Sequence, residues 1–314
     1  MKKRFPLFVF FSIILLSGCQ DKSLYTNKQV AMGTFCEVVS PDKNSAKIVF
    51  TEIKRIENLL SKYHPESEIS KLNKNGKLIA GPETYYILKK SHEFWKLSGG
   101  AFDITVAPLL DLWGFTDKQC ILPKKDQIKA ALKLIGSEKI YFNDSNNMVE
   151  FTVPGMKVDL GAIAKGYALD CAINKLKESG VKSCLINLGG QIYCLGSRFG
   201  RPWRIAVRDP RAEGGTTEIL DLTDKGVATS GDYEQYFINN NKRYSHIFNP
   251  KTGYPSDSGV IGTTIISERN LDADALSTAV FVMGKSKGRE FAKKFPGIEI
   301  KILEENNQKR GGNE

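Results

Sequence analysis

The sequence lacks the residues and motifs that mark several common classes of protein. It has only three histidines and six cysteines in 314 residues, and the cysteine spacings match no zinc pattern. It contains neither a Walker phosphate-binding loop nor a Gly-x-Gly-x-x-Gly dinucleotide fingerprint. Internal repeats, Pro/Gly/Ser-rich linkers and arginine-rich blocks are also missing. These absences argue against a zinc module, a P-loop nucleotidase, a Rossmann dehydrogenase and a nucleic-acid-binding protein.

The N-terminal residues have the pattern of a bacterial lipoprotein leader. Met1-Lys2-Lys3-Arg4 is basic, the run from Phe5 to Leu16 is apolar, and Ser17-Gly18-Cys19 places small residues directly before a cysteine. Such a run is too short for a spanning helix and is typical of a cleaved secretory signal. We therefore predict a signal peptide over residues 1–18 and lipidation at Cys19, the first residue of the mature protein. A plain signal peptide with an incidental Cys19 is the alternative.

A lipidated Cys19 implies an exported protein that a lipid anchor holds on the extracytoplasmic side of a membrane, facing the periplasm in a Gram-negative cell. Loss of the leader removes three positive charges and lowers the formal net charge from +10 to +7. The remaining excess follows no DNA- or RNA-binding motif, so no nucleic-acid partner is expected. The five other cysteines are expected to be mostly buried thiols, with one disulfide allowed in an oxidising compartment.

The order of predicted elements favours an α+β fold with mixed or antiparallel sheets. Hydrophobic periodicity predicts helices over residues 42–61, 82–97, 162–178, 271–284 and 285–294. Strands are predicted over residues 30–39, 156–160, 183–188, 203–207, 235–238, 243–248, 260–266 and 298–303. The two kinds of element do not alternate steadily, which argues against a doubly wound sheet. Residues 19–304 are long enough for one large domain or two intimately joined lobes, and residues 305–314 read as a polar tail.

The apolar helix that begins at Leu271 is the most informative segment, because it contains Asp274 and Thr278. A helix that is apolar on all sides should be buried, and a buried carboxylate is costly unless it is paired, hydrogen-bonded or bound to a metal. A spacing of four residues places the carboxylate and the hydroxyl on one face. Both are hard oxygen ligands of the kind that Mg²⁺ prefers. The alternative is an ordinary helix start in which Asp272 or Asp274 caps the first turn; with the segments below, Asp274 is expected to be the ligand and Asp272 the cap.

Three further places carry side chains that suit phosphate binding or proton transfer. Asp159-Leu160-Gly161 turns from a predicted strand into a helix, so free N–H groups and Lys165 could meet a phosphate; a tight turn that needs glycine for packing is the alternative. Residues 228–234 are rich in hydroxyls and read equally well as a turn near an edge strand. His246 stands at a strand end before a glycine-containing turn, where it could act as a general base or be merely structural.

In their order along the chain, these segments resemble the ApbE-type flavin transferases (FAD:protein FMN transferases). The resemblance runs over nearly the whole mature chain, through Met32-Gly33-Thr34 and residues 61–70, 99–115, 158–170, 228–234, 244–255 and 283–284. The family includes lipoproteins, which agrees with the predicted leader.

The resemblance implies a two-lobed α+β protein that binds FAD and Mg²⁺ in the cleft between its lobes. Its implied activity transfers the FMN half of FAD onto a Thr or Ser hydroxyl of an exported acceptor flavoprotein, such as a subunit of a membrane redox complex, and releases AMP. The residues that match the family's flavin-nucleotide contacts are Met32, Tyr63, Ala101, Phe102, Asp103, Asp159, Lys165 and Ile247. Those that match its metal ligands are Asp274, Thr278 and the backbone carbonyl of Ala162. His246 matches the residue proposed to help deprotonate the acceptor hydroxyl.

Two positions depart from the family's pattern, and two other functions remain open. Gln191 stands where the family more often has Asp, and Ala162 stands where some members carry a hydroxyl side chain. Breaking a pyrophosphate needs a divalent cation and a base. The remaining residues supply ligands for the cation, and His246 supplies the base. The same pocket would also suit an FAD pyrophosphatase, in which water replaces the acceptor hydroxyl and FMN is released free. A lipoprotein that binds FAD without chemistry is the third interpretation.

Overall fold

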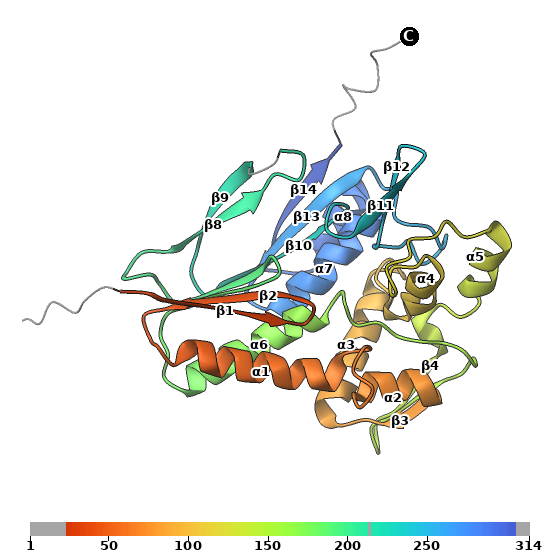
Figure 1. The fold of residues 1–314 in the computed structure, drawn as a ribbon, viewed down its shortest axis with the longest axis horizontal. Coiled ribbons are helices and arrows are strands. Elements are labelled where there is room, and N and C mark those ends of the chain that lie inside the picture. Colours follow the sequence, from red (N-terminus) through yellow and green to blue (C-terminus); the bar gives the residue numbers. More distant parts are fainter. Residues whose placement is uncertain (1–22, 213–214, 306–314) are drawn as a thin grey trace, which may run out of the picture.

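A seven-stranded antiparallel sheet organises the chain (Figure 1). The structure is a computed structural model that describes residues 23–212 and 215–305. In spatial order the strands are β1 (Tyr25–Ala31), β2 (Thr34–Ser40), β6 (Cys184–Leu188), β7 (Gln191–Leu195), β10 (Lys225–Gly231), β13 (Val260–Ser267) and β14 (Glu299–Glu304). Every residue of β13 is buried. Both faces of the sheet are therefore covered at this strand, which buries Thr263, Thr264 and Ser267 along with its Val and Ile residues.

The side chains of the central strands alternate between two hydrophobic clusters. In β10, Ala228 belongs to the main core under the helices, whereas Val227, one residue earlier, packs on the opposite face. A ribbon of β8 (Trp203–Arg208) and β9 (Thr216–Leu222) covers that opposite face. Successive strand residues point to opposite faces, so one strand contributes to both layers.

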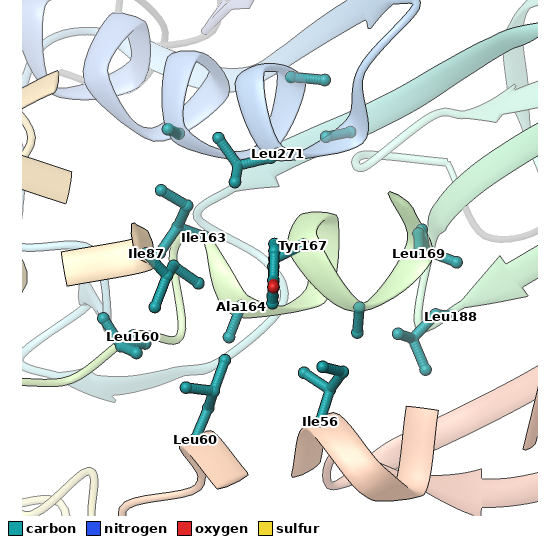
Figure 2. Packing of buried hydrophobic residues seen from close by; sticks show 14 of the residues in the cluster. Ile56, Leu60, Ile87, Leu160, Ile163, Ala164, Tyr167, Leu169, Leu188 and Leu271 are labelled. Atoms are coloured by element: carbon teal, nitrogen blue, oxygen red, sulfur yellow. The ribbon is translucent and has the colours of Figure 1, made fainter. Parts of the chain in front are cut away.

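Three helices cover the first face and form the main core. They are α1 (Ser45–Leu60), α6 (Ala164–Glu178) and α7 (Asn270–Met283). Figure 2 shows α6 lying between the other two, with Ile56 and Leu60 of α1 on one side and Leu271 of α7 on the other. Because α7 has neighbours on several sides, its sequence is apolar around most of the helix.

The remaining elements form a smaller lobe beside the large sheet (Figure 1). Its helices are α2 (Glu68–Asn75), α3 (Pro82–Leu97), α4 (Ala107–Leu112) and α5 (Lys125–Leu132). Its three-stranded sheet has the order β3 (Lys77–Ile79), β5 (Met148–Phe151), β4 (Ile140–Asn143). The hairpin of β11 (Tyr236–Asn239) and β12 (Lys242–Ser245) and the helix α8 (Lys285–Ala292) complete the fold.

Trp113 joins the hairpin to the smaller lobe. Its side chain is fully buried after α4, and the rings of Tyr244 and Phe248 lie 5.6 and 5.8 Å from it, centroid to centroid. Its indole N–H donates to the carbonyl of Gly253 at 3.1 Å. A buried tryptophan contributes a large apolar area and needs a partner for its N–H, and both requirements are met here. The chain between Tyr244 and Phe248, which contains His246, is thereby held in place.

The predicted α+β class is confirmed, and all strand pairs among the described residues are antiparallel. None of the described helices has the length and apolarity needed to cross a bilayer. The five cysteines within the described ranges are free thiols, and three of them, Cys36, Cys184 and Cys194, are buried. The predicted signal peptide, Cys19 and the tail from residue 306 lie outside the described residues.

Two of the predicted strands differ in the structure. Residues 30–39 form parts of β1 and β2, because Met32 and Gly33 both adopt positive φ angles, of 49° and 73°, and reverse the chain in a tight hairpin. Residues 156–160 form no strand. The side-chain amide of Asn73 takes the place of a neighbouring strand: the Val158 N–H donates to its Oδ1 at 2.7 Å, and its Nδ2 donates to the Val158 carbonyl at 2.9 Å.

Two local interpretations are also wrong, the first of them only in part. The segment 228–234 does turn after residue 231, but the strand before that turn is not an edge strand, because β10 lies inside the sheet, paired with β7 and β13. Asp272 does not cap the helix from Leu271. The cap comes from Asp170 of α6, whose carboxylate accepts the N–H groups of Asn270 and Leu271 at 2.8 and 3.0 Å. This acceptor is a hundred residues away in sequence, so no local pattern could reveal it.

Asp170→Ala is expected to lower the free energy of unfolding by about 1–2 kcal/mol, because two N–H groups at the start of α7 lose their acceptor. Urea denaturation at pH 8 measures the change, since burial raises the pKa of Asp170 to about 6 and the carboxylate is ionised at pH 8. Asp272→Ala is the control and should cost less than about 0.5 kcal/mol, because Asp272 only pairs with the half-exposed Arg269 at 3.6 Å. Equal losses in the two variants would contradict the assignment of the cap.

Candidate active site

A cavity of about 470 Å³ opens between the large sheet and the smaller lobe. The residues that the sequence named for flavin binding, metal binding and proton transfer all line it: Met32, Tyr63, Ala101, Phe102, Asp103, Asp159, Ala162, Lys165, His246, Ile247, Asp274 and Thr278. They come from six separate stretches of chain: 32, 63, 101–103, 159–165, 246–247 and 274–278. The structure therefore brings the whole predicted set together, while the role of each residue stays a prediction.

Asp274, on α7, is one of the residues that line this cavity. Its side chain is 3% exposed, and both carboxylate oxygens accept a hydrogen bond. The Gly166 N–H donates to Oδ2 at 3.0 Å, and the Gln191 amide Nε2 donates to Oδ1 at 2.5 Å. Burial raises the pKa of this carboxyl group, and the Lys165 ammonium and the two hydrogen bonds oppose the rise.

Gly166 allows α6 to approach α7 closely at this point. A Cβ atom built on Gly166 would lie 2.3 Å from the carbonyl oxygen of Asn270 and 2.8 Å from the Cβ of Asp274. No side chain fits at these distances without moving one of the helices. The absence of a side chain thus lets the Gly166 N–H reach the Asp274 carboxylate.

A chain of hydroxyls leads from Asp274 to Thr278. Ser277 Oγ donates to the Asp274 carbonyl at 2.8 Å, and Ser230 Oγ lies 2.8 Å from Ser277 Oγ and 3.1 Å from Thr278 Oγ1. Each hydroxyl has one proton. Because the Ser277 hydroxyl donates its proton to the Asp274 carbonyl, it can only accept from Ser230. The Ser230 hydroxyl therefore donates to Ser277 and accepts from Thr278. The lone pairs of Thr278 Oγ1 remain available to the cavity.

The carbonyl of Ala162 is released from the helix that follows it. In a regular helix start, the N–H of Gly166 would bind the carbonyl four residues earlier. Here that N–H is directed to Asp274, while the Ala164 N–H binds the Leu160 carbonyl at 2.8 Å and the Tyr167 N–H binds the Ile163 carbonyl at 3.1 Å. One hydrogen bond therefore positions the Asp274 carboxylate and leaves a second oxygen, that of Ala162, free at the cavity wall.

These oxygens fit a hard divalent cation. Within the described residues, no three His, Cys, Asp or Glu side chains gather closely enough to hold a metal. The donor set is instead one carboxylate, one hydroxyl and one carbonyl, which suits Mg²⁺, because this ion takes few protein ligands and keeps several waters. A buried carboxylate without an ion-pair partner within reach also gains from a nearby cation. Asp274, Thr278 and Ala162 are the residues that would hold it.

His246 follows β12 and is held in one tautomer. Its Nδ1 lies 3.2 Å from the carbonyl oxygen of Gln235. A carbonyl only accepts, so Nδ1 carries the proton and Nε2 has a free lone pair. Burial, together with the positive charge of Lys165, lowers the pKa of His246 to about 4. The ring is therefore neutral at physiological pH and can take up a proton.

Comparison with known proteins decides the family. A model of the ApbE family matches residues 32–302. The chain is 31% identical to the FAD:protein FMN transferase of Vibrio cholerae, over 90% of this chain and 88% of that protein. It is 30% identical to the enzyme of the same name from Treponema pallidum, over 89% and 84% of the two chains. The chain belongs to the ApbE family.

Solved ApbE structures show the same fold. The ApbE protein of Thermotoga maritima is 37% identical and superposes with a TM-score of 0.83 over 90% of this chain and 94% of that chain. The flavin transferase ApbE from Vibrio cholerae is 27% identical, with a TM-score of 0.81 over 91% and 94% of the two chains. The predicted family and fold class are therefore confirmed.

Asp103 and Asp159, two acidic residues predicted to contact the flavin nucleotide, have different kinds of partner. The carboxylate of Asp103 accepts from the Thr105 N–H and hydroxyl at 2.8 and 2.6 Å, and from Ser137, so it supports the local turn. Asp159 instead pairs with Lys62 at 2.7 Å, and Lys62 also lies 5.0 Å from the centre of the Tyr63 ring. Asp159 thus belongs to a largely buried ion pair in the cavity wall, whereas Asp103 supports the turn behind it.

The lining residues that were not among the predicted site residues include Lys62, Gln191, Ser230 and Glu234. Ser230 and Glu234 lie in the segment that resembled other ApbE proteins, so the sequence did contain a signal for them. Gln191 was noticed only as a departure from the family. No local pattern distinguishes Lys62 from the other lysines, because its partner Asp159 lies on another segment.

The ring of His246 is expected to titrate near pH 4 in the folded protein and near pH 6.5 in the unfolded chain. The unfolded state then binds the extra proton first, so the contribution of His246 to stability is complete above pH 6.5 and is lost as the pH falls toward 4. NMR titration of the histidine ring protons, in buffer and in urea, measures both midpoints. A folded-state midpoint at or above 6.5 would contradict the described environment.

Proposed function

We propose that this protein transfers the FMN half of FAD onto a Thr or Ser hydroxyl of an exported acceptor flavoprotein, with Mg²⁺ as the metal and AMP as the other product. The observation that carries the proposal is the joint presence, in one cavity, of a neutral histidine and a set of hard oxygen donors around Asp274. Family membership, and relatives named FAD:protein FMN transferase, support the same reaction.

Different residues of the cavity would bind the metal, the pyrophosphate and the flavin nucleotide. Asp274, Thr278 and the Ala162 carbonyl would hold the Mg²⁺ ion, which supplies positive charge to the pyrophosphate oxygens when it is bound. Lys165 adds a second positive charge close to Asp274 and His246. The exposed Tyr63 and the Lys62–Asp159 pair line the same cavity, where they would contact the flavin nucleotide.

His246 Nε2 takes the proton of the acceptor hydroxyl, while the hydroxyl oxygen bonds to the phosphorus of the FMN half. The bond from that phosphorus to the bridging oxygen breaks, and AMP leaves with the bridging oxygen. The Gln235 carbonyl keeps the ring in the tautomer that this step requires. General-base assistance of this kind is worth roughly 10²–10⁴-fold in rate.

His246→Gln is expected to lower kcat by roughly 10²–10⁴-fold while FAD still binds, because only the proton acceptor is lost. Asp274→Asn should remove most Mg²⁺-dependent turnover. The detergent-solubilised protein is mixed with FAD, Mg²⁺ and an acceptor that carries a flavinylation motif, and flavin fluorescence of the acceptor band and AMP are measured. His64→Gln, an exposed histidine outside the cavity, is the matched control.

The same experiment separates the other two functions. An FAD pyrophosphatase would release free FMN and AMP at the same rate with and without acceptor. A carrier would bind FAD but form neither product, and Asp274→Asn would leave its FAD binding largely intact. Absence of covalent flavin on a proven acceptor would refute the transferase.

We also propose that the protein is held by a lipid on Cys19, on the extracytoplasmic side of a membrane. The basic and apolar leader before Ser17-Gly18-Cys19 supports this. Mass spectrometry of the membrane-extracted protein should find an acylated Cys19 at the N-terminus, and Cys19→Ser should move the protein to the soluble fraction. Membrane recovery of the Cys19→Ser variant equal to that of the wild type would argue against the anchor.

A further inference from the structure

Gln191 occupies an unusual position beside Asp274. It is the first residue of β7, after the Gly189–Gly190 turn, and its side chain is 4% exposed at the cavity wall. Its amide nitrogen donates to Asp274 Oδ1 at 2.5 Å, the shorter of the two hydrogen bonds to that carboxylate. A hydrogen bond to a charged acceptor is strong and fixes the orientation of both groups.

The other end of the same amide has no partner. Gln191 Oε1 is buried and receives no hydrogen bond from any described residue. Turning the amide over would not help, because Oε1 would then face the carboxylate and the NH₂ group would be left alone. A buried carbonyl oxygen is costly when nothing donates to it. Since none of the described residues donates to Gln191 Oε1, this oxygen is available to a donor from a bound ligand or ion.

The surroundings of Gln191 indicate what that donor is. Asp274 and Ser230 line the same cavity, and Thr278 presents its lone pairs there. The Lys165 ammonium acts on Asp274, but it forms no hydrogen bond to Gln191 within the described part of the chain. A small hard cation held by these oxygens carries waters, and such waters donate hydrogen bonds. Outer contacts of this kind orient metal ligands and tune the affinity for the metal.

We infer that Gln191 is a positioning residue of the cation site: its Nε2 orients Asp274, and its Oε1 accepts a hydrogen bond from a water on the bound divalent cation. The inference rests on the divalent cation of the proposed function. The inference also gives a role to Gln191 at the position where the family more often has Asp. An amide orients Asp274 without placing a further negative charge in hydrogen-bond contact with it.

The test measures Mg²⁺ binding to the full-length protein without FAD, by titration calorimetry and by the Mg²⁺-induced rise in Tm. Gln191→Leu keeps a similar volume but removes both the donor and the acceptor, and its Mg²⁺ affinity should fall roughly 10- to 100-fold. Gln191→Glu places a second carboxylate beside Asp274. Its Tm without Mg²⁺ should be lower than that of the wild type, and its Mg²⁺-induced rise in Tm larger, because the cation relieves the repulsion. Gln119→Leu, the same change at an exposed loop position, should match the wild type.

The outcomes distinguish this inference from the function on which it rests. If the wild type binds no divalent cation, the proposed metal dependence fails. If the wild type binds Mg²⁺ and a folded Gln191→Leu variant binds it equally well, only the role of Gln191 is overturned. If Gln191→Leu does not fold, the Glu variant decides, and a Mg²⁺-induced rise in Tm no larger than that of the wild type overturns the inference.

Discussion

The burial of a single carboxylate, that of Asp274, is the constraint on which the site depends. A carboxylate in an apolar helix between a sheet and two other helices must be compensated, and three groups from two elements, α6 and β7, do so. Helix α6 supplies the Gly166 N–H, β7 supplies the Gln191 amide, and Lys165 supplies positive charge. Each contribution requires the elements to be closely packed, so the core that surrounds α6 (Figure 2) also sets the geometry of the site.

The two lobes contribute different chemistry to the cavity. The large sheet and its helices carry the oxygen donors, which are rigid because they lie on buried elements. The smaller lobe holds His246 indirectly, through the packing of Tyr244 and Phe248 on Trp113. A base on a hairpin and a cation site on a helix are thus fixed relative to each other by hydrophobic contacts that take no part in the reaction.

Prediction from the sequence succeeded where a signal is local and failed where a partner is distant. The helices from residues 45, 82, 164 and 270 follow from periodicity, and the motif segments contain all the predicted site residues that line the cavity. Residues 156–160 have strand-like composition, but a side chain of α2 satisfies their backbone. The cap of α7 and the ion pair of Lys62 come from other segments, and a strand such as β10 reads the same at an edge or inside a sheet.

The sequence by itself determined the family, the α+β class and the identity of the residues that gather in the cavity, because these follow from ordered motifs and from hydrophobic periodicity. The tertiary structure alone decided which hydrogen bonds those residues make. It assigned the helix cap to Asp170 rather than Asp272, freed the Ala162 carbonyl, fixed the tautomer of His246 and left Gln191 Oε1 without a donor among the described residues. The reason is physical: hydrogen-bond partners in a buried site are set by the close approach of elements far apart in sequence, and that approach depends on packing.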